Sequence, residues 1–89
     1  MNFLHYEVTT GPTDSIRVSL TGNAANVLVM DDVNFQSYRS GSQHHYYGGY
    51  YTRSPAIIKP PHAGHWHVVV NLGGLIGTVN ALVQVIPGR

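Results

Sequence analysis

The chain has 89 residues, which is the size of one domain, and we assign a single domain to residues 1–89. Five Lys and Arg residues against four Asp and Glu residues give a net charge of +1, which excludes the basic surface that nucleic acids and anionic membranes attract. The chain holds no cysteine, which excludes disulfides, thiolate metal ligands and a thiol nucleophile. No apolar run approaches the ~20 residues of a membrane span, and we expect a cytoplasmic protein that binds no membrane.

Two strands are predicted in the first third of the chain. Residues 15–21 alternate, with Ile16, Val18 and Leu20 on one face and polar side chains on the other, which is typical of a half-buried strand. Residues 26–30 are apolar on both faces, which predicts a central strand that is covered on each side.

A short helical turn is predicted over residues 33–40. The strand before it closes at Asp31 and Asp32, whose carboxylates we expect to cap a turn. Phe35 and Tyr38 are three residues apart, as on one helix face, and Asn34 is the predicted cap.

The tyrosine-rich segment 44–52 is predicted to be a hairpin. Gly48 and Gly49 can adopt the positive φ angles of a two-residue type I′ turn, with aromatic arms on either side. In that register, Tyr47 faces Tyr50 and Tyr46 faces Tyr51.

Three further strands complete the prediction. Residues 56–59 form an edge-like segment that Pro60 and Pro61 end, because proline cannot donate to a ladder. Residues 65–72 form the longest apolar strand, which ends at Gly73-Gly74, interpreted as a hairpin connection to a last strand over 78–85. Seven to eight short strands with one helical turn predict an all-β fold, a single antiparallel, jelly-roll-like β-sandwich.

Several of these motifs together resemble a bacterial family catalogued as domain of unknown function 1883. Members are small stand-alone proteins or domains attached to a Toll/interleukin-1-receptor-type signalling domain, and the resemblance implies no enzymatic activity, ligand or catalytic residue. The residues that carry it are Ala25 to Asp31 with Asn34, Phe35 and Tyr38, then Tyr46 to Gly49 with Ser54-Pro55, then Gly64-His65-Trp66 with Val70 to Gly74.

The chemical pattern that stands out is His65-x-His67. Residues i and i+2 of a strand share a face, so two imidazoles there can bind one metal ion, and a third and fourth ligand could come from His62, His44 or His45. The competing interpretation is that both histidines face solvent or form hydrogen bonds within the sheet, because Trp66 and Val68 mark the opposite face as the core.

The sequence favours a non-catalytic protein-interaction or self-associating module that needs no cofactor. Its partner would be a second copy or another protein chain, since low charge with exposed aromatic side chains favours association. The alternative is a small β-barrel that binds a divalent transition metal or another ligand at the His65-x-His67 strand. The predicted interaction surface consists of Tyr46, Tyr47, Tyr50 and Tyr51 together with Phe35 and Tyr38.

Overall fold

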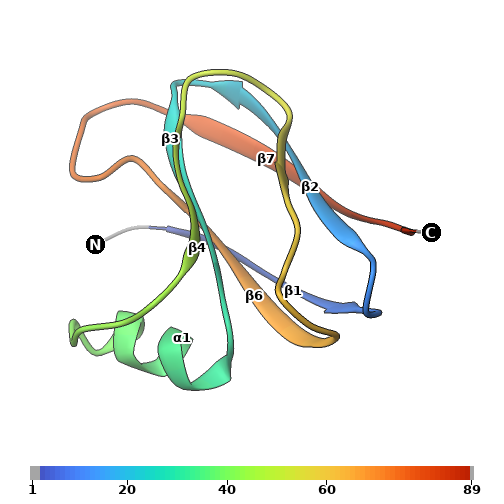
Figure 1. Cartoon of the computed structure of the whole chain (residues 1–89). Coiled ribbons are helices and arrows are strands. Elements are labelled where there is room, and N and C mark those ends of the chain that lie inside the picture. Colours follow the sequence, from blue (N-terminus) through green and yellow to red (C-terminus); the bar gives the residue numbers. More distant parts are fainter. Residues whose placement is uncertain (1–2, 89) are drawn as a thin grey trace.

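A computed structural model describes residues 3–88, which form two antiparallel sheets and one helix (Figure 1). One sheet has the strand order β1-β6-β3-β4 and the other has the order β5-β2-β7. The predicted all-β sandwich is therefore confirmed. The elements are β1 (Leu4–Thr10), β2 (Ser15–Gly22), β3 (Ala25–Met30), α1 (Asp32–Arg39), β4 (Tyr47–Tyr51), β5 (Ala56–Ile58), β6 (Gly64–Asn71) and β7 (Val79–Ile86).

The main core lies between the two sheets. Inward-facing side chains of β2, such as Ile16 and Val18, meet those of β3 and β6, and Trp66 and Val68 of β6 are almost fully buried there. This confirms the predicted inner face of the His65-x-His67 strand. Because side chains alternate along a strand, His65 and His67 must point to the outer face of the four-stranded sheet.

Helix α1 covers part of that outer face and creates a second, smaller core. Leu28 and Met30 of β3 point away from the main core between the two sheets and pack with Phe35 of the helix and Val69 of β6. Both faces of β3 are therefore buried, as its uniformly apolar sequence predicts. The helix stands outside the two sheets in Figure 1.

Asp31, one of the two carboxylates expected to cap a turn, is the N-cap of α1, so that prediction is confirmed and the predicted Asn34 cap is wrong. Its carboxylate accepts a hydrogen bond from the backbone N–H of Asn34 at 2.9 Å, which satisfies one of the free N–H groups of the first turn. The Asn34 side chain instead accepts from the His45 backbone N–H at 2.8 Å and so fixes the segment after the helix. Within the described residues, no helix has the length and apolar content needed to cross a membrane.

The predicted hairpin at Gly48-Gly49 is wrong. Both glycines lie inside the single strand β4, which pairs with β3 over its whole length, from Ala25 opposite Tyr51 to Val29 opposite Tyr47. Two glycines in an alternating segment are compatible with a turn or with a strand that lies very close to its neighbour, and the second applies here.

The connection after β6 also differs from the prediction. Gly73-Gly74 does not join two paired strands, because β7 pairs with β2 in the other sheet. The segment from Leu72 to Thr78 crosses between the sheets, as the orange loop of Figure 1 shows, and leaves Leu75 and Ile76 exposed.

Candidate metal centre

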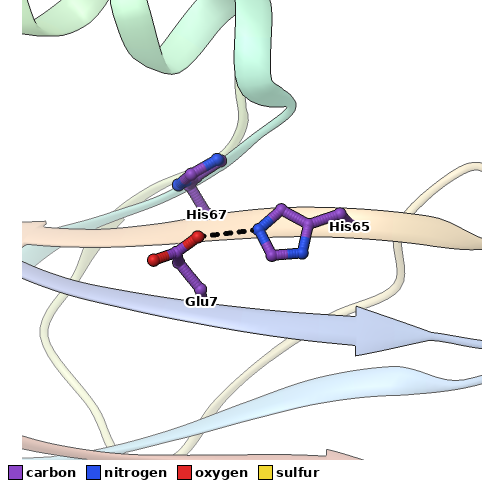
Figure 2. Close-up of side chains that lie close together, drawn as sticks. All are labelled: Glu7, His65 and His67. Carbon is purple, nitrogen blue, oxygen red and sulfur yellow. Dashed lines mark hydrogen bonds and ion pairs between the residues drawn. The ribbon is translucent and has the colours of Figure 1, made fainter.

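Three ionisable side chains gather on the outer face of the four-stranded sheet, next to the helix (Figure 2). Glu7 comes from β1, and His65 and His67 come from β6. In the antiparallel register Glu7 is directly opposite His67, so the two side chains share a face and lie side by side. Strand pairing therefore places a carboxylate next to two imidazoles.

The donor atoms of these three residues all lie within 4.8 Å of one another. His65 Nε2 forms a 2.8 Å hydrogen bond with Glu7 Oε1. A second carboxylate comes from the first residue of α1, because Asp32 Oδ1 lies 2.5 Å from His67 Nε2 and 4.0 Å from His65 Nε2. The two imidazoles thus face carboxylates from a strand on one side and a helix on the other.

His67 is the most buried member of the cluster. Its side chain is 8% exposed, against 43% for His65 and 54% for Glu7. The Phe35 ring stacks on it with ring centroids 4.3 Å apart, and His5 Nε2 lies 2.8 Å from its Nδ1 atom. A hydrogen bond between two imidazoles needs one protonated and one unprotonated nitrogen, so this contact orients the His67 ring.

The surroundings favour a neutral His5 and an ionised Glu7. Burial lowers the pKa of His5, and the neighbouring His67 lowers it further. The hydrogen bond with His65 lowers the pKa of Glu7, so the carboxylate stays charged at neutral pH. A charged carboxylate beside imidazoles is a ligand set that divalent transition metals accept.

Among the histidines proposed from the sequence, His65 and His67 lie together but His62 does not join them. The His62 ring packs on Trp66, whose ring lies on the other face of β6, with centroids 5.0 Å apart. The carboxylates come instead from Glu7 and Asp32, which sequence reasoning did not connect with His65-x-His67. The period-two alternation of residues 4–10 could have indicated a strand there, with His5 and Glu7 on one face.

The aromatic residues proposed as an interaction surface are divided between several environments. Tyr46, Tyr47 and Tyr50 are exposed, with 47%, 47% and 57% of their surface in solvent. Tyr51 is half-buried and packs against the main core, whereas Phe35 is buried in the second core. Tyr38 is partly buried; its hydroxyl accepts a hydrogen bond from the Asn71 side chain, and its ring contacts those of Phe3 and His44.

The cluster offers donor groups of the types that bind divalent metals in proteins. Two imidazoles and one carboxylate are a common three-ligand set for divalent zinc and iron, and the remaining positions are filled by water or substrate. Metal–ligand bonds of about 2.1 Å need donor atoms roughly 3.4 Å apart, so the Glu7 and His65 donor atoms, which are 2.8 Å apart, have to separate by roughly 0.6 Å, and donor atoms up to 4.8 Å apart have to approach each other. Both side chains are exposed enough to make this movement.

Comparison with known proteins gives one match. The model of a family described as domain of unknown function (DUF1883) matches residues 1–89, the whole chain. No curated protein and no solved structure matches the chain significantly.

Proposed function

The chain belongs to the DUF1883 family, whose description assigns no activity, and we propose that it is a metal-binding domain that holds one divalent transition metal ion on Glu7, His65 and His67. The observation that carries this proposal is the convergence of three donor atoms from β1 and β6 within 4.8 Å. Imidazole and carboxylate together favour zinc, nickel or iron over calcium and magnesium, which prefer ligand sets made of oxygen alone.

The surroundings of His67 support a site over a chance surface contact. Surface histidines ordinarily sample several rotamers, whereas the His67 ring is held by Phe35 and His5. Groups that hold a metal-ligating histidine in place typically raise metal affinity 10–100-fold. The His67 ring is therefore already ordered before an ion arrives, which reduces the entropy cost of binding.

Isothermal titration of untagged protein with ZnCl₂, and separately with NiCl₂, tests the proposal. We expect one equivalent of metal to bind, with a Kd in the micromolar range or below. Glu7→Gln keeps the shape of an exposed side chain and should weaken binding about 10-fold or more, and His67→Ala should weaken it about 100-fold or more. Circular dichroism of each variant checks that it folds.

His62→Ala is the matched control, because it removes a histidine of the same strand region that lies outside the cluster. Its metal affinity should equal that of the parent. A parent protein that binds neither ion, or a His62→Ala variant that loses as much affinity as His67→Ala, would disprove the proposed ligand set.

Self-association through β4 is a second candidate function. This strand forms one edge of the four-stranded sheet, and Tyr47 and Tyr50 on it are exposed. Natural edge strands are usually protected from pairing by charges or prolines, and β4 contains neither. Other edge strands do have such protection, because β1 carries the charged Glu7 and Pro87 directly follows β7.

The occupant that fits this edge is the β4 strand of a second copy. Two identical edges pair antiparallel about a twofold axis, and a net charge of +1 per chain opposes the association little. Sedimentation velocity should then detect a dimer. Tyr50→Lys should weaken it about tenfold or more, because each dimer gains two lysines at one interface, whereas Ile57→Lys on β5 should not. A parent that stays monomeric at several hundred micromolar would refute this candidate.

A further inference from the structure

Asp32 lies beside the cluster of Glu7, His65 and His67 but is placed differently from its three members. Glu7, His65 and His67 belong to two paired strands, which the sheet holds together, whereas Asp32 is the first residue of α1. Its Oδ1 atom lies 2.5 Å from His67 Nε2 and 4.0 Å from His65 Nε2. Figure 2 shows the helix immediately beside His67. A ligand at this position connects the helix to the sheet.

The helix depends on few contacts with the rest of the molecule. It has eight residues, and isolated helices of this length do not persist in water. Phe35 is its buried residue, while Val33, Gln36 and Arg39 are exposed. The position of α1 is therefore set by the packing of Phe35, by the polar contacts at its first turn, and by Tyr38, whose ring contacts Phe3 and whose hydroxyl accepts a hydrogen bond from Asn71.

The contact between Asp32 and His67 is a weak anchor without a metal. The Asp32 side chain is 69% exposed, and pairs between a solvated carboxylate and its partner are screened by water and salt. A metal ion shared by Asp32 and the two imidazoles makes direct bonds to all three, which water does not displace as readily. Metal binding therefore strengthens the connection between the first turn of the helix and the sheet.

We propose that Asp32 is a fourth ligand of the metal held by Glu7, His65 and His67, so that metal occupancy fixes α1 on the sheet and regulates its opening. This inference rests on the proposed metal-binding function. Metal binding would then change the opening of the chain mainly at α1. Opening of α1 exposes Phe35 and uncovers the second core, and bound metal suppresses this opening.

Backbone amide hydrogen exchange, followed by NMR with and without saturating ZnCl₂, tests whether the metal fixes α1 on the sheet, which we call the clamp. In the parent, zinc should slow exchange of the α1 amides, those of Phe35 to Arg39, about 10-fold or more. Amides of β2 and β7 in the other sheet provide an internal reference, and their exchange should slow less. In Asp32→Asn, which preserves shape but is a poor metal ligand, zinc bound at saturation should leave α1 exchange nearly unchanged.

Titration of the same Asp32→Asn protein separates the two proposals. We expect zinc to bind it about 10-fold or more weakly than the parent, through the three remaining ligands. If the parent binds zinc but Asp32→Asn binds it equally well, or α1 exchange in the parent does not slow more than that of β2 and β7, the clamp is wrong and the three-residue site stands. If the parent does not bind zinc, both proposals fail.

Discussion

Replacing Phe35 by alanine is expected to lower the free energy of unfolding by about 3–5 kcal/mol. The Phe35 side chain is 4% exposed and fills the space between the helix and the sheet. Its ring stacks on His5 and His67, with centroids 4.1 Å and 4.3 Å away. Alanine would leave a cavity under a two-turn helix that has no other buried side chain. Urea denaturation followed by tryptophan fluorescence measures the effect.

Val33→Ala is the control for this experiment. Val33 lies on the same helix but is 75% exposed, so its truncation should change the free energy of unfolding by no more than about 0.5 kcal/mol. If Phe35→Ala also lowered the free energy of unfolding by no more than about 0.5 kcal/mol, the second core would contribute almost nothing to stability. Phe35→Ala should also loosen the His67 ring and thereby weaken zinc binding, whereas Val33→Ala should not.

The sequence predicts the two-sided burial of β3 and the alternation of β6 because both follow from the geometry of a strand. Val27 and Val29 must point opposite to Leu28 and Met30, and an apolar residue at every position requires cover on both sides. The same rule places His65 and His67 on one face without knowledge of any partner strand. These predictions need only local spacing, which the sequence contains in full.

The rest of the candidate metal centre depends on pairing between distant segments. Glu7 and His65 are 58 residues apart, and the register of β1 against β6 brings them together. Asp32 reaches His67 only because the helix folds back over the outer face of the sheet. A single sequence does not specify which strands are neighbours, so a carboxylate near the histidines could not be predicted from spacing along the chain.

The glycine pair of β4 illustrates the opposite failure, where a local signal favours the wrong structure. Gly-Gly between aromatic arms is typical of a hairpin turn, since glycine adopts positive φ without strain. Gly48 does have a φ of +117°. It uses this freedom inside a strand, next to the Val27 carbonyl of β3, which only tertiary structure reveals.

Gly48→Ala is therefore expected to destabilise the protein by about 2–4 kcal/mol, or roughly 10–20 °C in Tm. A Cβ at this position would overlap the Val27 carbonyl oxygen and lie 3.2 Å from the Ile58 side chain. Alanine also strains a backbone held at φ +117°. The strand β4 can relieve the overlap only by moving away from β3, which breaks ladder hydrogen bonds. Differential scanning calorimetry measures the loss.

Gly49→Ala is the adjacent control and separates a strand from a turn. No atom outside the neighbouring residues lies within 4 Å of a Cβ placed on Gly49, and its φ is not positive. Alanine there should be neutral or stabilising by up to about 1 kcal/mol, because it reduces the conformational freedom of the unfolded chain. A type I′ turn requires positive φ at both central residues, so it would make the two substitutions similarly harmful. A large loss for Gly48→Ala beside no loss for Gly49→Ala distinguishes the paired strand from the hairpin.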